Sequence, residues 1–258
     1  MLLVVDAGNT KITFGFFEGD RLEKVGSITC SANIGCSELK KQIKENFFCY
    51  KPDSCMIASV VDEITENLKN SISEVFCVKP IILSTEINYG IKIKSLHPEK
   101  YGADRIANAY AASKLYSERP LIVIDSGSAT TFEVIDRDGE LAGGLIMPGM
   151  ELQLKALGEK TSKLPSLSLS NTPENINVIS NDTEEAIYAG VIMAHAQAVQ
   201  GLIKLCEQKL GEKAFIIGTG GNILLVDKFL NEKRIDVINP ILTLEGIRQL
   251  YNLNIIAV

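Results

Sequence analysis

Two stretches of this sequence place a carboxylate and small polar residues directly after an apolar run. In the first, four apolar residues (2–5) lead to Asp6 and then to Ala7-Gly8-Asn9-Thr10-Lys11. Glycine lets the main chain approach a ligand closely, and N–H groups, a hydroxyl and a lysine face an anion readily. The stretch predicts a phosphate-binding turn with Asp6 on the magnesium side, although the same residues also suit an ordinary hairpin.

The pattern returns near the middle of the chain. Ile122-Val123-Ile124 is followed by Asp125-Ser126-Gly127-Ser128-Ala129-Thr130, again an apolar run, an acid, a glycine and small hydroxyl residues. Repetition at about half the chain length predicts a duplicated unit. We expect two acidic hairpins that face each other across a cleft, one holding the β-phosphate and the other the γ-phosphate of a nucleotide.

The elements that must position these acids alternate between strands and helices. After the first hairpin, the spacing predicts a strand over 54–59 and a helix that Asp62 caps and that runs to about residue 73. Such alternation is typical of an α/β fold with a partly parallel sheet. We predict a first domain over 1–118 and a second over 119–258, with the C-terminal helix either in the second domain or packed back on the first.

Two other stretches have residue types suited to chemistry. Gly102-Ala103-Asp104-Arg105 opens an alanine-rich helix that is expected to be central or at an interface. On the residues alone, Asp104 favours the helix N-terminus electrostatically and Arg105 is its solvated neighbour. Thr219-Gly220-Gly221 forms a turn between a predicted strand and helix, and such a turn lets a nucleotide lie on the main chain. His195, inside a long predicted helix over 182–210, is interpreted as a core histidine.

Composition excludes several classes of protein. The 258 residues are 46% hydrophobic and carry a net charge of −6, which argues against nucleic acid as the main partner. Six cysteines without a C-x-x-C pair, and only His97 and His195, argue against a zinc site. Without a signal-peptide pattern or an apolar run of about 20 residues, we expect a cytoplasmic protein with reduced thiols and no membrane partner.

The sequence also lacks the signatures of other nucleotide-binding and hydrolytic enzymes. It contains no G-x-x-x-x-G-K-[ST], no G-x-S-x-G and no G-x-G-x-x-G. The P-loop, serine-hydrolase and nicotinamide-dinucleotide classes are therefore disfavoured.

Taken together and in this order, the motifs resemble the actin-like, sugar kinase and Hsp70 ATPase superfamily. Within it the chain resembles the type III pantothenate kinases, the first enzymes of coenzyme A synthesis. The resemblance rests on these segments: 6–10, 102–105, 125–130, 143–149, 181–187, 219–221 and 242–246. It implies two similar actin-like (ribonuclease H-like) domains with mixed sheets flanked by helices, and ATP-dependent phosphorylation of pantothenate to 4'-phosphopantothenate by a homodimer.

The resemblance also implies a role for each matching residue. Asp104 is the expected catalytic base. Asp6 lies on the Mg²⁺ side and Asp125 at a monovalent cation, K⁺ or NH₄⁺. The residues expected to bind ATP are Asp6, Ala7, Gly8, Asn9, Thr10, Lys11, Ile12, Thr13, Ser128, Gly220 and Gly221. Those expected to bind pantothenate are Ser95, Gly102, Ala103, Asp104, Arg105 and Thr183, the last reached across the dimer interface.

Two positions depart from the family pattern on the acceptor side. Ser95 stands where the family commonly has a tyrosine that lines the pantothenate pocket, and His97 stands where it usually has an asparagine. This departure leaves two alternatives open beside pantothenate kinase. One is a kinase of the same superfamily that acts on another small hydroxyl acceptor, and the other is a non-catalytic nucleotide-binding regulator.

Overall fold

A computed structural model describes residues 1–30, 34–84 and 86–255, and it forms two compact units. The first unit comprises Met1–Leu115 together with Ile241–Val258, and the second comprises Tyr116–Pro240. The predicted boundary between residues 118 and 119 falls close to this division. The C-terminal segment belongs to the first unit by its contacts, which is one of the two placements that the sequence left open.

The first unit is built on a five-stranded mixed sheet with the order β3-β2-β1-β4-β5. Its strands are β1 (Leu2–Ala7), β2 (Lys11–Glu18), β3 (Arg21–Thr29), β4 (Ser54–Ser59) and β5 (Ile81–Ile82). The helices of this unit are α1 (Cys36–Phe47), α2 (Asp62–Phe76), α3 (Ala103–Leu115) and α7 (Leu242–Ile255), with a short 3₁₀ turn η1 (Pro98–Lys100). The strands β1 and β2 pair antiparallel, whereas β1 and β4 pair parallel.

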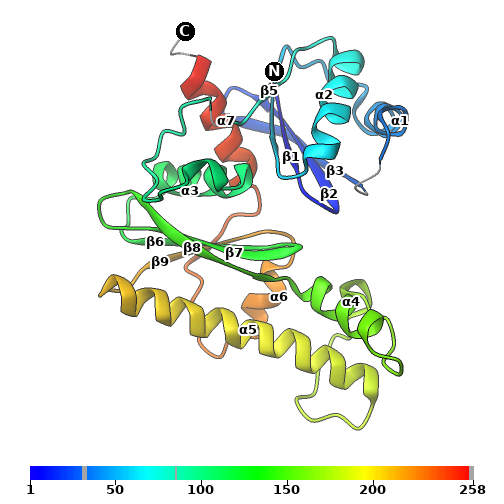
Figure 1. Cartoon of the computed structure of the whole chain (residues 1–258), viewed down its shortest axis with the longest axis vertical. Helices are drawn as coiled ribbons and strands as arrows, with labels where there is room; N and C mark the ends of the chain where they lie inside the picture. Colours follow the sequence, from blue (N-terminus) through cyan, green and yellow to red (C-terminus); the bar gives the residue numbers. More distant parts are fainter. Residues whose placement is uncertain (31–33, 85, 256–258) are drawn as a thin grey trace. The chain divides into compact units, whose positions relative to one another are not determined.

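Helices cover both faces of the first sheet because its central strand is apolar on both sides. Leu3 and Val5 of β1 belong to the core that contains the buried residues of α1 and α2, whereas Leu2 and Val4 belong to the core that contains those of α3 and α7. This alternation follows from the two-residue period of a strand. In Figure 1, α1 and α2 lie side by side in blue and cyan.

The second unit repeats this arrangement with the sheet order β10-β9-β6-β7-β8. Its strands are β6 (Leu121–Ser126), β7 (Ala129–Ile135), β8 (Leu141–Pro148), β9 (Phe215–Thr219) and β10 (Val237–Ile238). The helices are α4 (Met150–Lys160), α5 (Thr183–Leu210) and α6 (Ile223–Lys228), with a 3₁₀ turn η2 (Leu169–Asn171). Figure 1 shows the long helix α5, in yellow, running along the sheet, and its buried side chains share a core with β6 and β7.

Strand pairing confirms the duplication that the two acidic motifs predicted. In both units a hairpin comes first (β1–β2 and β6–β7), and the first strand of each hairpin then pairs parallel with a later strand (β4 and β9). The predicted α/β fold with two mixed sheets is therefore confirmed. The expectation for Asp62 is wrong in detail, because Val61 occupies the N-cap of α2 and Asp62 is the first helical residue.

Helix α5 has a property that the sequence interpretation did not anticipate. It is the one helix among the described residues that is both long enough and apolar enough, by length and composition, to cross a membrane. Half of its most apolar window is buried inside the structure, and a helix packed on a sheet meets the same criterion. This finding is weak support for a membrane span.

Candidate active site

The first acidic motif forms the predicted hairpin at the end of β1. Asp6 lies opposite Thr13 of β2 and beside Ala58 of β4, and its side chain is half-buried. The N–H of Gly8 donates to the carbonyl of Lys11 at 3.0 Å and closes the turn. The main chain of the turn is therefore held by its own strands.

Neighbouring residues hold and shape this turn. The N–H of Cys30, at the end of β3, donates to the carbonyl of Thr10 at 3.1 Å. Asn9, Thr10 and Lys11 are exposed, whereas the expected ATP contacts Ala7 and Ile12 are completely buried. The polar side chains that reach solvent are thus those of the turn itself. The side chains of Ala7 and Ile12 do not reach solvent, so these two residues could contact ATP only through their main chain.

The stretch from Gly102 to Arg105 places Asp104 in the first turn of α3. Its Oδ1 accepts the N–H of Arg105 at 2.8 Å. Burial raises the pKa of the Asp104 carboxyl above its ordinary value, and the Arg105 N–H and charge offset this effect only in part. A carboxylate with a raised pKa in the first turn of a helix is suited to accept a proton.

Gly102 provides the space that the Asp104 carboxylate occupies. A Cβ on Gly102 would lie 2.5 Å from Asp104 Oδ1, closer than such atoms approach. Tyr101 directly precedes Gly102, and its ring centroid lies 5.0 Å from the guanidinium of Arg105, within the range of a cation–π contact. The glycine and the aromatic residue before the helix therefore shape the surroundings of both charged side chains.

A cavity of about 360 Å³ opens beside the start of α3. Its lining combines hydroxyl, charged and aromatic side chains: Ser59, Val60, Leu83, Ser84, Tyr89, Glu99, Lys100, Tyr101, Gly102, Ala103 and Ile106. Two of the predicted acceptor contacts, Gly102 and Ala103, line it, whereas Asp104 and Arg105 are not among its lining residues. The cavity volume lies within the range of small-molecule sites.

Ser95 is not part of this described lining. Its hydroxyl instead accepts the N–H of His97 at 3.0 Å within a local turn. Sequence reasoning missed the aromatic residues that do line the cavity, Tyr89 and Tyr101, and it missed Lys100. The last two directly precede Gly102, so proximity to the motif was a usable signal, whereas Tyr89 lies in a segment without a periodic pattern.

The first hairpin and this cavity are joined by the end of β4. Ala7 lies beside Ser59 in the parallel pairing, and the N–H of Val60 donates to the carbonyl of Ala7 at 3.2 Å. A Cβ on Gly102 would lie 3.4 Å from Val60 Cγ1. Ala7, the residue after the acid of β1, and Gly102 before α3 thus both lie against the end of β4, whose Ser59 and Val60 line the cavity.

The second acidic motif forms the equivalent hairpin of the second unit. Asp125 lies opposite Thr131 of β7 and beside Thr219 of β9. The N–H of Gly127 donates to the carbonyl of Ala129 at 3.0 Å, so a glycine N–H also closes this hairpin, whose turn is one residue shorter than the first. Ser128 is exposed at the turn, as its expected role as an ATP contact requires.

The late glycine turn packs against this second hairpin. The N–H of Asn222 donates to the carbonyl of Ser126 at 2.9 Å. Gly220 has a left-handed backbone with φ of 88°, and a Cβ there would overlap Asp125 Oδ1 and the main chain of Ser126. The structure therefore brings Gly220 to Asp125, and only glycine fits at this position. Gly221 is the next residue of the same turn.

Thr183 lies elsewhere in the second unit, at the start of α5. It is exposed and follows Asp182, whose side chain caps the helix by accepting the N–H of Glu185 at 2.9 Å. It lines a second cavity of about 520 Å³ between α4, α5 and Leu164. The other lining residues are largely apolar: Gln153, Leu157, Leu164, Ala186, Ile187, Gly190 and Val191.

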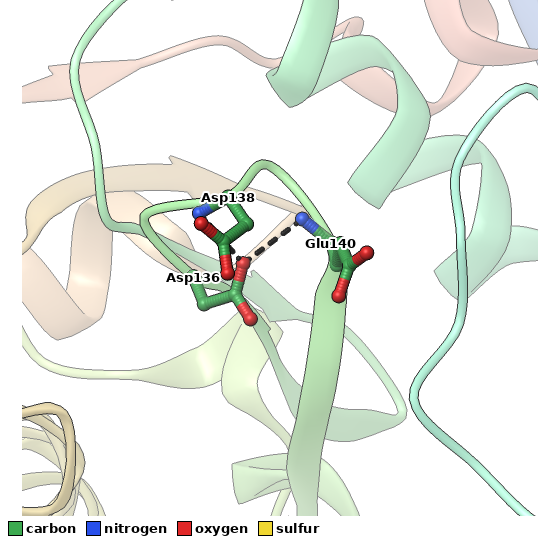
Figure 2. A group of neighbouring side chains, drawn as sticks. All are labelled: Asp136, Asp138 and Glu140. Carbon is green, nitrogen blue, oxygen red and sulfur yellow. Dashed lines mark hydrogen bonds between the residues drawn. The ribbon is translucent and has the colours of Figure 1, made fainter.

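One acidic group among the described residues resembles a metal site but belongs to a different part of the second sheet. Figure 2 shows Asp136, Asp138 and Glu140 in the β7–β8 turn, with ligand atoms within 4.8 Å of one another. Asp136 Oδ1 accepts the N–H groups of Asp138 and Glu140, both at 3.0 Å, which is ordinary turn geometry. Because Ile135 pairs with Leu121, this turn lies at the opposite end of β6 from Asp125.

Known proteins resemble this chain in fold and, in one comparison, in sequence. A structure of a Baf family transcriptional activator from Campylobacter jejuni is 20% identical, with a TM-score of 0.60 over 97% of this chain and 98% of that one. The activator of the 2-hydroxyisocaproyl-CoA dehydratase from Clostridium difficile, solved with bound ADPNP, is 15% identical, with a TM-score of 0.56 over 98% and 96%. At these identities the likeness shows the fold alone, which agrees with the predicted actin-like architecture.

A sequence comparison goes further than the fold. The model of the family described as type III pantothenate kinase matches residues 2–205, which include both acidic hairpins, the start of α3 and most of α5. The match covers far more than half of the 258 residues. The chain therefore belongs to the type III pantothenate kinase family.

Proposed function

We propose that Asp104 is the base that accepts the proton of the pantothenate hydroxyl while the hairpin of residues 6–13 binds the phosphates of ATP. Family membership gives the overall reaction, the ATP-dependent phosphorylation of pantothenate to 4'-phosphopantothenate in coenzyme A biosynthesis. In this step the hydroxyl oxygen forms a bond to the γ-phosphorus, the bond from that phosphorus to ADP breaks, and the hydroxyl proton passes to Asp104. Phosphoryl transfer needs alignment and charge neutralisation more than covalent help.

The observation that carries this proposal is the environment of Asp104. The carboxyl group belongs to the residue that follows Gly102 and Ala103 of the cavity lining, in the first turn of α3, and burial raises its pKa. A base is most effective when its pKa lies nearer the working pH than that of an ordinary aspartate. Gly102, which lines the cavity, has no side chain that would displace the carboxylate.

We assign the acceptor to the cavity beside α3. Pantothenate carries a carboxylate, and Lys100 in the lining supplies a positive charge, with Glu99 as its acidic neighbour. Tyr89 and Tyr101 provide aromatic walls where the family's usual tyrosine is replaced by Ser95. These side chains support pantothenate as the acceptor despite that departure.

The two hairpins have the donors that the expected cations need. Mg²⁺ and K⁺ prefer oxygen ligands, and Asp6 and Asp125 each present a carboxylate beside a turn of main-chain groups. At Asp125 the absence of a side chain on Gly220 lets its main chain lie against the carboxylate. We propose that Asp6 lies on the Mg²⁺ side and that Asp125 holds the monovalent cation, with Ser128, Gly220 and Gly221 contacting ATP. Bound cations would neutralise charge on the phosphates.

We also propose that the protein is a homodimer in which Thr183 serves the acceptor site of the partner. The exposure of Thr183 and its place in a cavity support an intermolecular role. Mixing Asp104→Asn with Thr183→Ala protein tests this role. If Thr183 acts across the interface, a mixed dimer contains one site with both native residues, so activity returns. If it acts within its own chain, no mixture is active.

Release of ADP tests the function directly. Purified protein with ATP and Mg²⁺ is assayed with and without pantothenate, and K⁺ is then exchanged for Na⁺. We expect release only with pantothenate, and faster release in K⁺. Binding of ATP without turnover of pantothenate, together with turnover of another alcohol, would identify a different acceptor. Failure to turn over any acceptor despite ATP binding would favour a regulator.

A further inference from the structure

A chain of hydrogen bonds runs through the second unit from α4 to the β6–β7 hairpin. This hairpin carries Asp125 and Ser128, and it is called the nucleotide hairpin below. Gln153 Nε2 lies 2.9 Å from His195 Nδ1, and His195 Nε2 lies 3.0 Å from the hydroxyl of Thr130. The Thr130 hydroxyl in turn lies 3.5 Å from that of Ser126, a weak contact. His195, Thr130 and Ser126 are each 1% exposed or less, so these groups depend on one another for partners.

The geometry fixes which nitrogen of His195 carries the proton. Gln153 Nε2 also lies 2.9 Å from the carbonyl of Pro148, which only accepts, so the amide nitrogen must face that carbonyl. The same NH₂ group then donates its second hydrogen to His195 Nδ1, which must be unprotonated. The proton of the neutral imidazole is therefore on Nε2 and is donated to Thr130.

A charged imidazole does not suit this position. Burial lowers the pKa of His195, and a proton on Nδ1 would point at an amide that is itself a donor. His195 thus remains neutral at physiological pH and acts as a fixed link between one donor and one acceptor.

The chain ends on both sides of the turn that carries Ser128. Thr130 and Ser126 belong to the two strands of the hairpin, and Pro148 is the last residue of β8. The next residue, Gly149, donates its N–H to the carbonyl of Ser128 at 3.0 Å, and a Cβ there would overlap the main chain of the turn. Whatever holds Thr130 and Pro148 in place therefore also holds the turn.

We propose that His195, as the neutral Nε2–H tautomer, is a positioning residue for the nucleotide hairpin. Acting through Gln153 and Thr130, it keeps the strand ends around the turn in the arrangement that binds ATP. This inference rests on the proposed role of the hairpin in nucleotide binding. It predicts an effect on nucleotide affinity that is separate from any effect on the acceptor.

Nitrogen NMR tests the tautomer without reference to activity. The sequence has only two histidines, so His97→Asn protein labelled with ¹⁵N shows His195 alone. We expect the long-range ¹⁵N–¹H pattern of the Nε2–H tautomer, unchanged between about pH 7.5 and about pH 6. Gln153→Glu should move the proton to Nδ1, because a carboxylate accepts where the amide donated. An Nδ1–H or charged imidazole in the otherwise native chain would overturn the proposal.

A matched pair of variants tests the positioning role. Thr130→Val removes the hydroxyl but keeps the shape, whereas Thr130→Ser keeps the hydroxyl. Losing a hydrogen bond worth about 1 kcal/mol corresponds to about a 5-fold change in affinity. We expect Thr130→Val to raise the Kd for ATP by about this factor, with KM for pantothenate unchanged and with Thr130→Ser close to the parent.

The outcomes separate this inference from the proposed function. Native protein that binds no ATP would overturn the role of the hairpin and the positioning role with it. Native protein that binds ATP with an affinity that Thr130→Val does not alter would overturn the positioning role alone. A lower Tm in Thr130→Val without a change in Kd would assign the chain to stability instead.

Discussion

The backbone of Gly102 lies so close to the Asp104 carboxylate that a Cβ on the glycine would be 2.5 Å from Asp104 Oδ1. Gly102→Ala must therefore move the carboxylate. Because proton transfer depends on hydrogen-bond reach, we expect kcat to fall about 10-fold or more, with ATP affinity retained. Steady-state kinetics and nucleotide titration measure the two quantities separately.

Gly201→Ala provides the control for this change. Gly201 is an exposed residue of α5, and a Cβ there meets nothing within 4 Å. Alanine has a higher helix propensity than glycine, so this variant should be at least as stable as the parent. If Gly102→Ala were as active as Gly201→Ala, the carboxylate would not need its present position.

Asp104→Asn should separate catalysis from stability. Removing a general base costs about 100-fold or more in kcat. The folded pKa of Asp104 is raised, so its contribution to stability is fully present below the ordinary pKa and is lost as pH rises through the raised pKa. At neutral pH the buried charge therefore destabilises the fold. We expect the asparagine variant to have a higher Tm and almost no turnover, and a lower Tm would contradict this account of the site.

The same pKa shift predicts the acid side of the pH–rate profile. Only the ionised carboxylate accepts a proton, so kcat should fall as pH drops through the raised pKa of Asp104. The inflection should lie above the value for an ordinary aspartate. Measuring kcat at saturating substrates between about pH 4 and pH 8 locates it. A profile with an inflection at the ordinary aspartate value would show that burial does not tune this group during turnover.

The duplicated architecture could be predicted from the sequence because its signal is local. An apolar run that ends in an acid and a glycine marks a strand and its turn, and both Asp6 and Asp125 lie where this pattern places them. The start of α3 at Ala103 was also local, since a glycine precedes an alanine-rich run.

Features that depend on tertiary contacts were not accessible in the same way. Tyr89 reaches the cavity through a segment without regular pairing, which the reciprocal hydrogen bonds of Asn254 in α7 with the main chain of Asn88 hold in place. His195 was interpreted correctly as a core residue, but its partners come from α4 and β7. Such long-range pairs have no periodic signature in a single sequence.

Asp125→Asn should act on the cation and the nucleotide more than on the chemical step. An amide retains an oxygen ligand but loses the negative charge, so K⁺ is held more weakly. We expect a higher KM for ATP and a smaller rate difference between K⁺ and Na⁺. Titrating KCl at constant ionic strength measures this dependence. A variant that keeps the full preference for K⁺ would exclude Asp125 as the monovalent cation site.

The last prediction concerns the helix pair that supports Asp104. In the first unit, α7 packs against α3 so closely that a Cβ on Gly246 would overlap the carbonyl of Ala107, and Thr243 donates to the buried Asn108 Oδ1 at 2.8 Å. Gly246→Ala must push the helices apart, which typically costs about 1 to 3 kcal/mol. Denaturant unfolding should show this loss, whereas Gly201→Ala should not. Because α3 carries Asp104 at its start, the folded fraction of Gly246→Ala should also have a reduced kcat. If unfolding were unchanged, the close contact between the two helices would not be needed to hold α3.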